Sequence, residues 1–567
     1  MYYQAVAFDY DGTLAKDGHV DEATVEALRR LKESGRRLIL VSGRERPDLL
    51  RAFPEVDLFD RLVLENGAVL CGPGDATVAL AEPPPPVLVE RLREHGVDPL
   101  SEGDVIVSTW EPNETAVLEA IRDLGLEHQV IFNKGAVMVL PPGINKAFGL
   151  GAALEDLQLS PHNVVGIGDA ENDMAFLNRC GCAVAVANAL PSIKERADVV
   201  TESARGAGVV EIAERLLAND LADVPTPCRH RIDLSEPEAD AHWPGRGAAV
   251  LIAGTSGSGK STLVQAILER LSERDYQFCI IDPEGDYDQL ANAFTVGSQE
   301  QPPAMSQVLD ILEDPRANIA VNLLAIPLRE RPDCFTDILS RLLQLRLRRG
   351  RPHWIVVDEA HHMVSPRVAA HASELPKQLD SLVFVTVHAD QLAAAALEKV
   401  KLVMAVGEAQ DQTIATFARQ AKLPVPELPA GGGTPQTMTV WNVDAPEARE
   451  LPRPVPKGER RRHIRKYAEG QLGEDKSFYF RGPDERLNLR AQNLSVFMQL
   501  AIGVDDATWL HHLRQRDYSR WFREAIKDQD LAHEVAAAEE RFAADAALSR
   551  ERIFAEIERR YTAPAAG

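Results

Sequence analysis

Hydrophobic and polar positions alternate along the N-terminal part of the chain in blocks typical of strands and helices in turn. Short apolar runs occur at Ala5–Phe8, Arg37–Val41, Val63–Leu64 and Val164–Ile167. Between them lie amphipathic segments such as Glu22–Glu33, whose apolar positions recur at helical spacing. Strands separated by helices predict a parallel sheet that is covered by helices.

The tract Pro83–Pro86 interrupts this rhythm and predicts the beginning of an inserted cap, over about residues 80–142. We therefore expect a first unit at residues 1–215. Residues 216–246 are rich in Pro, Asp, Glu and His without clear periodicity, which predicts a linker with one strand at Arg229–Leu234.

A second alternating series predicts another α/β unit at residues 247–445, followed by a Pro- and Arg-rich joint at Arg449–Lys466. Residues 446–567 are predicted to be a mainly helical accessory region. The strands expected in the second series are Ala248–Ala253, Phe278–Ile281, Trp354–Val357, Leu382–Val387, Leu402–Val406 and Met438–Val443.

Composition and charge indicate where the protein is expected to act and which partners are disfavoured. The 567 residues carry a formal net charge of −24, which disfavours nucleic acid as a partner, although a local basic track can still bind it. No apolar run reaches the roughly 18 residues that span a bilayer, and the first residues lack the basic region of a signal peptide. The six cysteines have no zinc-ligand spacing. We expect a cytoplasmic protein without a membrane partner.

The first apolar run ends in two carboxylates, Asp9 and Asp11, which are followed by Gly12. Ligands bind at the carboxyl ends of parallel strands, and this pair suits a nucleophile and a separate acid/base on one loop. A calcium loop is the alternative, but its D-x-[DN]-x-[DN]-G pattern is not met because Gly12 comes too early.

Two further polar segments can bind a phosphate. Ser42 and Gly43 end the second apolar run and offer a hydroxyl and backbone N–H groups. Lys146 can neutralise a phosphate and the nucleophile together. A polar residue at a strand end is often only a helix cap, so each segment alone is a weak signal.

The last apolar run of the first unit ends in Asp169, Asn172 and Asp173. Carboxylate oxygens from Asp9 and Asp169 are the hard ligands that Mg²⁺ prefers. Four polar segments in this order, each after an apolar run, indicate one site.

Together these segments resemble the haloacid dehalogenase superfamily, in its Cof-type branch with a C2-like cap, and Glu65–Ala68 also matches that branch. The resemblance implies that Asp9 attacks phosphorus and forms an aspartyl-phosphate. It implies that Asp11 protonates the leaving group and then activates water. The favoured substrates are small phosphorylated metabolites such as sugar phosphates or phosphoglycolate.

The same resemblance assigns the remaining residues of the site. The phosphoryl group would be bound by Ser42, Gly43, Lys146 and Asn172. Mg²⁺ would be held by Asp9, the backbone carbonyl of Asp11, Asp169 and, in support, Asp173.

A second constellation begins with LIAGTSGSGKST at residues 251–262, a complete G-x-x-x-x-G-K-[ST] loop between an apolar strand and a predicted helix at Leu263–Glu273. The backbone N–H groups of such a loop surround phosphates. Lys260 is expected to reach the β- and γ-phosphates of ATP, and Ser261 to reach Mg²⁺. The predicted ATP-binding residues are Gly254, Thr255, Ser256, Gly257, Ser258, Gly259, Lys260, Ser261, Thr262 and Thr386.

The strand Trp354–Val357 ends in Asp358 and Glu359. Asp358 is expected to hold Mg²⁺ through water, and Glu359 to polarise an attacking water. Small-metabolite kinases share the loop but need no such base, so ATP hydrolysis is favoured. Thr386 or His388 on the next strand would sense the γ-phosphate, although His388 is equally well explained as a strand-end histidine.

With Asp282–Tyr287, these motifs resemble HerA/FtsK-like ATPases over about residues 245–445. The resemblance implies a single RecA-type core that assembles into a homo-oligomeric ring, in which a neighbour donates an arginine. Candidates lie in Arg341–Arg351, although a solvated helix face explains that cluster better than a nucleic-acid track does. Asp358–His361 also spells the box of a helicase class, but no residues remain for the second core that those helicases need.

Aromatic and polar residues are mixed between about residues 475 and 535. Such aromatics can stack on bases or sugars, but a small helical core explains them better. The adjacent pair His511 and His512 is a poor metal site, because neighbouring residues point apart on a helix.

The predicted fold class is α/β multidomain, with a Rossmann-like core and inserted α+β cap, a RecA-like P-loop core and a mainly helical C-terminal region. The favoured function is a bifunctional hydrolase, a Mg²⁺-dependent phosphomonoesterase fused to an ATPase. One alternative is a nucleic-acid translocase with an end-processing phosphatase. Another is an ATP-dependent regulatory or sensor protein in which either site binds its ligand without turnover; the intact pair Asp9/Asp11 and Glu359 disfavour it.

Overall fold

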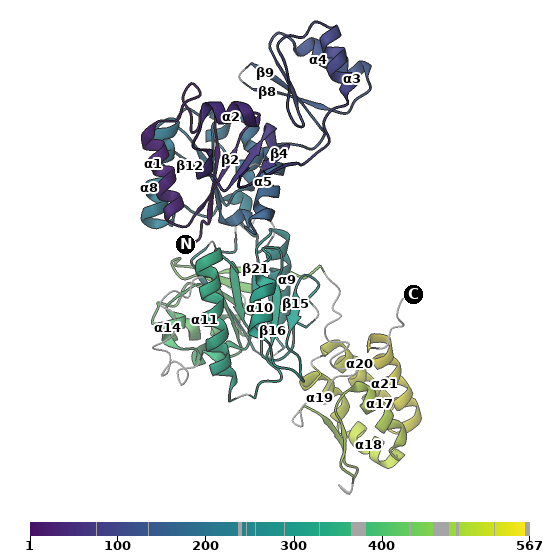
Figure 1. The fold of residues 1–567 in the computed structure, drawn as a ribbon. Helices are drawn as coiled ribbons and strands as arrows, with labels where there is room; N and C mark the ends of the chain where they lie inside the picture. Colours follow the sequence, from purple (N-terminus) through teal and green to yellow (C-terminus); the bar gives the residue numbers. More distant parts are fainter. Residues whose placement is uncertain are drawn as a thin grey trace.

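The protein is described by a computed structural model of residues 1–567. The structure describes all residues except 75, 134, 236–240, 245, 256, 289, 328, 365–380, 430–432, 458–475, 484–486, 527 and 562–567. Two sheet-containing units lie one above the other, and a smaller C-terminal module lies to the side of the lower unit (Figure 1).

Within the described residues, the first unit is built on an eight-stranded sheet in which β1 lies between β10 and β2. β1 reads AVAFD and is buried along its length, as expected for a parallel strand with both faces covered. The order is β12 (Val199–Val200), β11 (Cys182–Ala185), β10 (Val164–Gly168), β1 (Ala5–Asp9), β2 (Arg37–Val41), β3 (Arg61–Leu64), β4 (Val69–Cys71) and β5 (Thr77–Ala79).

Helices cover both faces of this sheet (Figure 1). α1 begins at Asp21, whose carboxylate accepts a hydrogen bond from the Thr24 backbone N–H at 2.7 Å, and it buries its apolar stripe on the sheet. The helices are α1 (Glu22–Glu33), α2 (Arg46–Ala52), α5 (Lys146–Asp156), α6 (Met174–Arg179), α7 (Pro191–Lys194) and α8 (Gly206–Asn219).

The inserted cap lies at the far end of the first unit from the second unit (Figure 1). It has its own apolar core between two helices and one face of a four-stranded antiparallel sheet. Its elements are α3 (Pro86–Glu94), β6 (Leu100–Glu102), β7 (Val107–Trp110), α4 (Glu114–Asp123), β8 (Gln129–Asn133) and β9 (Ala136–Leu140).

In the described part of the second unit, nine strands form one sheet, and β18 separates the loop-bearing strand β13 from β17. The order is β15 (Phe294–Val296), β16 (Ile319–Asn322), β14 (Phe278–Asp282), β17 (Trp354–Val357), β18 (Leu382–Thr386), β13 (Ala249–Ala253), β19 (Val400–Val406), β20 (Thr437–Asn442) and β21 (Arg449–Pro452). Its helices are α9 (Lys260–Glu273), α10 (Met305–Leu312), α11 (Arg331–Arg349), α12 (Ala360–Met363), α14 (Ala394–Leu397) and α15 (Gln410–Gln420).

The C-terminal module is a small helical unit whose aromatic side chains form its core, as predicted. Phe497 lies at the centre of this core, with the rings of Phe478, Phe480 and Trp521 within 5.4 Å of its own. The elements are β22 (Phe478–Phe480), β23 (Leu489–Ala491), α17 (Leu494–Gly503), α18 (Asp506–Arg514), α19 (Asp517–Glu524), α20 (Gln529–Arg541) and α21 (Ala546–Tyr561).

The described part of residues 216–246 differs from the predicted linker. The strand predicted at Arg229–Leu234 is wrong, because a 3₁₀ turn occupies Cys228–His230 and only a single bridge pairs Asp233 with His242. Leu234 and Trp243 are buried in the core of the second unit. Their burial depends on contacts distant in sequence, and such contacts leave no local periodicity.

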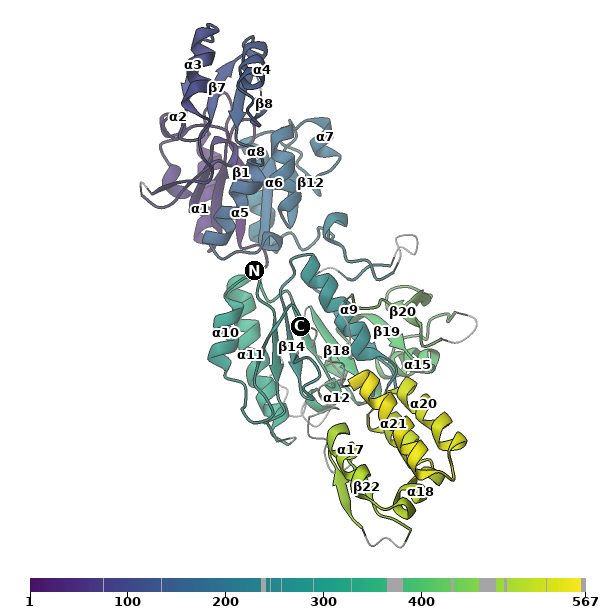
Figure 2. The same cartoon turned by 90° about the vertical axis from the view of Figure 1, so that its right-hand side faces the viewer.

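The two sheet units meet at a buried seam formed by the residues that precede their strands. Asn163, just before β10, donates from its Nδ2 to the Gly350 carbonyl oxygen at 3.2 Å, and its Oδ1 lies 3.2 Å from Nε2 of His353, just before β17. Nε2 of His162 lies 2.6 Å from the carbonyl oxygen of Arg274. Because the seam joins strand beginnings, the carboxyl edges of the two sheets face away from each other (Figure 2).

Among the helices of the described residues, none has the length and apolarity that crossing a bilayer requires.

Candidate functional sites

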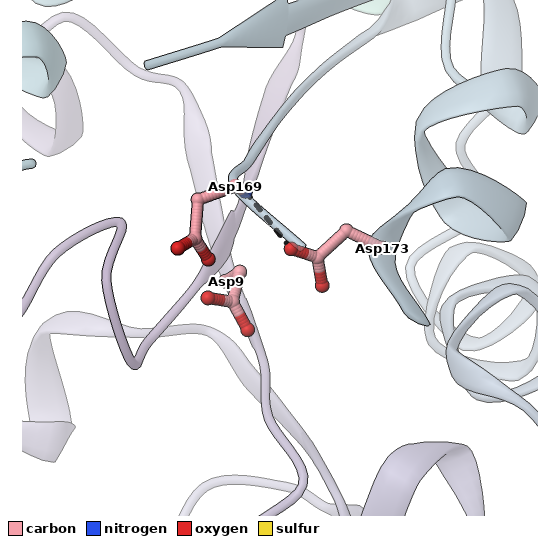
Figure 3. A group of neighbouring side chains, drawn as sticks. All are labelled: Asp9, Asp169 and Asp173. Atoms are coloured by element: carbon pink, nitrogen blue, oxygen red, sulfur yellow. Dashed lines mark hydrogen bonds between the residues drawn. The ribbon is translucent and has the colours of Figure 1, made fainter. Parts of the chain in front are cut away.

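Three carboxylates gather at the carboxyl edge of the first sheet. Asp9 ends β1 and Asp169 follows β10, so both lie at the point where the chain's strand order reverses. Asp173 comes from the short turn after β10 (Figure 3). One ligand oxygen from each residue lies within 4.8 Å of the other two, and all three side chains are buried.

Lys146, the first residue of α5, balances this negative charge. It is only 2% exposed, and its Nζ donates to Oδ1 of Asp9 at 2.5 Å and to Oδ1 of Asp173 at 2.6 Å. The other oxygen of Asp173 accepts hydrogen bonds from the backbone N–H groups of Asp169 and Ala170, both at 2.9 Å. Asp173 therefore fixes both the lysine and the loop that carries Asp169.

Burial and mutual repulsion shift the proton affinities of these groups. Burial raises the pKa of the Asp9 carboxyl to about 7, Asp173 adds to the rise, and Lys146 opposes it. Burial alone would lower the pKa of Lys146, but Asp173 and Asp9 outweigh it and raise that pKa. A cation beside Asp9 would favour its ionised form.

Ser42 and Gly43 follow β2, whose Val41 pairs in register with Asp9. The Ser42 hydroxyl oxygen accepts from the backbone N–H of Arg44 at 3.2 Å. Asn66 joins this turn to the acidic loop, because its amide lies against Gly43 and its Oδ1 accepts from Nδ2 of Asn172 at 3.1 Å. Asn66 received no role from the sequence, although it lies in the Glu65–Ala68 match.

Asp11 is held by an arginine to which the sequence assigned no role. Nε and Nη2 of Arg44 donate to the two carboxylate oxygens of Asp11, each at 2.7 Å, and Nη1 donates to Asp48 at 2.6 Å. The hydrogen bonds with Asp11 are the main reason that the pKa of Arg44 is raised. The only available signal was the position of Arg44 directly after Ser42 and Gly43.

Glu65 anchors the cap to the core. Its carboxylate accepts hydrogen bonds from the backbone N–H groups of Asp104, Val105 and Ile106 at 2.8 to 2.9 Å. A cleft of about 630 Å³ lies between cap and core, and its lining includes Asp11, Asp169, Asn172 and the cap residue Phe132. A small ligand in this cleft would touch both the acidic edge and the cap.

The phosphate loop of the second unit connects β13 to α9. Gly257 and Gly259 have φ of 77° and 92°, a backbone conformation that favours glycine. Nζ of Lys260 donates to the carbonyl oxygens of Gly254 and Thr255 at 3.0 Å. Ser261 and Thr262 lie in the first turn of α9. Ser256 lies outside the described residues.

Asp358 and Glu359 follow β17, and Glu359 has a left-handed backbone with φ of 46°. Such strain often accompanies function. Thr386 ends β18, the strand between β13 and β17, and pairs in register with Ala253 just before the loop. Its Oγ1 lies 3.1 Å from Nδ1 of His361. These pairings place Thr386 between the phosphate loop and Glu359.

The remaining residues predicted to act in ATP hydrolysis are His388 and an arginine within Arg341–Arg351. His388 contacts Thr386 through its backbone N–H at 3.0 Å. Of the arginines in Arg341–Arg351, Arg341 pairs with Asp337 on its own helix and Arg349 pairs with Glu313. Arg351 is buried in the seam, where Nη2 donates to the carbonyl oxygen of Gln158 at 3.0 Å.

Comparisons with known proteins give separate matches for the N-terminal part and for the part that follows it. A family described as haloacid dehalogenase-like hydrolase matches residues 6–87 and 106–212, and an AAA ATPase domain matches residues 240–373. The phosphoglycolate phosphatase of Methanothermobacter thermautotrophicus is 32% identical over 223 residues, 38% of this chain and 99% of that protein. The phosphoglycolate phosphatase of Aeropyrum pernix is 29% identical over 223 residues, 38% of this chain and 93% of that protein. A solved haloacid dehalogenase-like hydrolase from Bacteroides thetaiotaomicron is 22% identical with a TM-score of 0.34, covering 38% of this chain and 99% of that one.

The class defined by these matches is a hydrolase. By its N-terminal part, the chain belongs to the haloacid dehalogenase-like hydrolase family, and it also carries an AAA ATPase region. The predicted family and fold class are thereby confirmed. The narrower resemblance to HerA/FtsK-like ATPases stays a prediction, as do the domain boundaries.

Proposed function

We propose that the N-terminal part is a Mg²⁺-dependent phosphomonoesterase for a small phosphorylated metabolite. The observation that carries this proposal is the buried group of Asp9, Asp169, Asp173 and Lys146 at the carboxyl edge of the sheet. Phosphoglycolate is the first candidate substrate, because relatives of this part bear the name phosphoglycolate phosphatase. Sugar phosphates are the second.

The proposed reaction uses Asp9 as the nucleophile. Its carboxylate oxygen bonds to phosphorus while the ester oxygen leaves with a proton from Asp11. Asp11 then takes a proton from water, which attacks the aspartyl-phosphate and releases inorganic phosphate and free Asp9. Arg44 orients Asp11 for both proton transfers through its two 2.7 Å hydrogen bonds.

The acidic group fits a magnesium ion. Asp9 and Asp169 offer hard carboxylate oxygens close together, and Asp11 would add its backbone carbonyl. Asp173 is engaged by Lys146 and two backbone N–H groups, so we assign it a supporting role. When bound, the ion would supply positive charge to the phosphoryl oxygens and the nucleophile.

The phosphoryl group would be bound by Lys146, the Ser42 hydroxyl, the Gly43 backbone N–H and Asn172. Lys146 already contacts the proposed nucleophile, so it lies beside the position that the phosphoryl group must occupy. The cleft of about 630 Å³ suits a small ester, and Phe132 brings the cap to it.

For the second unit we propose ATP binding and hydrolysis. Lys260 would bind the β- and γ-phosphates, Ser261 and Asp358 the magnesium ion, and Glu359 the attacking water. Thr386 would sense the γ-phosphate. This assignment is supported by β18, which brings Thr386 between the loop and Glu359.

A phosphatase screen of the full chain tests the first proposal. The substrates are phosphoglycolate, sugar phosphates and nucleotides, each assayed with Mg²⁺ and with chelator, and with and without ATP. We expect Mg²⁺-dependent release of phosphate from one of the small esters. Release that is equal with chelator would overturn the metal assignment, and no release from any ester would overturn the phosphatase.

A further inference from the structure

Arg453 follows β21 directly and lies against the phosphate loop of the second unit. Its Nη1 donates to the carbonyl oxygen of Ser258 at 2.9 Å. A Cβ atom at Gly259 would lie 1.8 Å from the same nitrogen, so the guanidinium occupies the space above this glycine. Glycine is therefore required at position 259 for two reasons: the backbone has a φ of 92°, and the Arg453 guanidinium occupies the space of a side chain.

The loop thus carries two cations on its own carbonyl oxygens, Arg453 on Ser258 and Lys260 on Gly254 and Thr255. Phosphate oxygens bind a guanidinium through two parallel hydrogen bonds and more strongly than a neutral carbonyl does. A triphosphate in the loop would compete with these carbonyls for both side chains.

The segment that contains Arg453 is rich in proline and therefore conformationally restricted. Residues 452–457 read PRPVPK, and each proline fixes its own φ near −65°. The far end is tied to α9, because the Lys457 backbone N–H donates to Glu269 at 2.7 Å and its Nζ to Glu273 at 2.6 Å. We call residues 452–457 the strap. Since α9 begins at the phosphate loop, both ends of the strap contact the same loop–helix unit.

Three of the arginines in the cluster predicted to serve a neighbouring chain have their contacts elsewhere. Arg341 and Arg349 form ion pairs within this chain, and Arg351 lies in the seam. Arg453 differs from them because it touches the loop itself.

We propose that Arg453 contacts the terminal phosphate of ATP and that the strap supplies it in cis, so that each chain completes its own nucleotide site. This proposal rests on the second unit's proposed ATP binding. An arginine supplied in cis neutralises charge that develops on the transferred phosphoryl group, as one from a partner chain does. ATP hydrolysis would then need no neighbouring subunit.

The test compares full-length Arg453→Gln and Arg453→Lys with the wild type. Arg449→Gln is the matched control, since Arg449 begins β21, the strand that Arg453 follows, and pairs with Glu447. We expect Arg453→Gln to lower kcat for ATP at least about tenfold. It should weaken ATP binding while ADP binding stays within about twofold, because only ATP has the terminal phosphate. Arg453→Lys should recover part of the rate, and Arg449→Gln should match the wild type.

Mixing two variants tests whether Arg453 acts in cis, on the nucleotide site of its own chain, or in trans, on that of a neighbouring chain. Lys260→Ala chains keep Arg453, and Arg453→Gln chains keep the loop lysine. We expect a mixture to show only the sum of the separate rates; restored hydrolysis would overturn action in cis. Equal losses of ATP and ADP affinity, or a lysine variant no better than glutamine, would overturn the phosphate contact. If the wild type binds ATP without hydrolysing it, the ATPase proposal fails, and the ATP-against-ADP comparison still decides the role of Arg453.

Discussion

The imidazole ring of His162 stacks on the phenol ring of Tyr276, with centroids 3.8 Å apart and 12° between their planes. His162 belongs to the first unit and Tyr276 to the second, so this stack lies in the seam. The seam joins residues that precede β10 and β14, while the carboxylates of both sites follow the other ends of their strands. The two sites therefore lie on opposite sides of the seam, at strand ends that face away from each other (Figure 2).

The buried histidines of the seam predict a loss of stability in acid. Burial lowers the pKa of His162 to about 3 and that of His353 well below its ordinary value. Unfolded histidines bind protons below about pH 6.5 while the buried rings do not, so protons favour the unfolded state. The contribution of His162 to the free energy of unfolding should be complete above about pH 6.5. It should fall by up to about 2 kcal/mol by pH 5, and fall further until the pH reaches the folded pKa.

Unfolding curves at pH 7.5, 6 and 5 measure this effect. His162→Gln keeps an amide donor for the Arg274 carbonyl but cannot titrate, so its stability should fall less with acid than that of the wild type. His95→Gln, at an exposed helix end away from the seam, is the control. An unaltered slope in His162→Gln would contradict the prediction.

Asp9→Asn should abolish phosphatase activity, because an amide cannot attack phosphorus. The variant should hydrolyse ATP at the wild-type rate, because the two sites lie on two different sheets whose carboxyl edges face away from each other. Phosphate release from phosphoglycolate and from ATP is measured on the same preparation, with Asp57→Asn, an exposed carboxylate, as control. Loss of both activities in a folded Asp9→Asn protein would rule out separate sites.

Much of the fold was predictable because strand tips leave a local signal. Asp9 and Asp169 each follow an apolar run, and the carboxyl ends of parallel strands share an edge. The pattern at residues 248–253 and the loop after it likewise predicted a strand, a turn and a helix. These features depend on neighbours in sequence.

The features missed depend on partners far away in sequence. Arg44 meets Asp11 across 33 positions and Arg453 meets Ser258 across 195. Trp243 is buried by a sheet whose strands follow it. Likewise, β21 extends the second sheet beyond the last predicted strand, because pairing with β20 outweighs its proline. Periodicity carries no information about such contacts.

Replacing Arg44 should slow the phosphatase. Arg44→Lys keeps a positive charge but cannot hold both oxygens of Asp11, so we expect kcat/KM to fall at least about tenfold from misplacement of the acid/base. Arg44→Ala should lose more. Arg51→Lys is the matched control, since Arg51 contacts Asp48 from the solvent side at 3.3 Å. Steady-state kinetics with phosphoglycolate decide, and equal rates for Arg44→Lys and the wild type would exclude the orienting role.

Glu65→Gln should loosen the cap. The carboxylate accepts three backbone hydrogen bonds, and an amide nitrogen in place of one oxygen leaves at least one N–H without an acceptor. The expected loss of stability is about 1–3 kcal/mol. Hydrogen exchange at Asp104, Val105 and Ile106 should accelerate. Glu45→Gln is the control, because its amide oxygen can still accept from Ser101; equal protection in both variants would contradict the anchor.

Glu359→Gln should separate ATP binding from hydrolysis. Glutamine matches glutamate in size and adds no backbone strain beyond what glutamate already bears at a φ of 46°, so Lys260 and the loop should stay in place and bind ATP as in the wild type. Loss of the base that activates water should lower turnover at least about a hundredfold. The neighbouring His361 is a poor replacement for this base, because burial lowers its pKa to about 4 and so weakens its affinity for the proton of water. Single-turnover hydrolysis and binding of a fluorescent ATP analogue are measured with Glu398→Gln, an exposed glutamate, as control. A Glu359→Gln protein that turned over ATP at the control rate would remove Glu359 from the reaction.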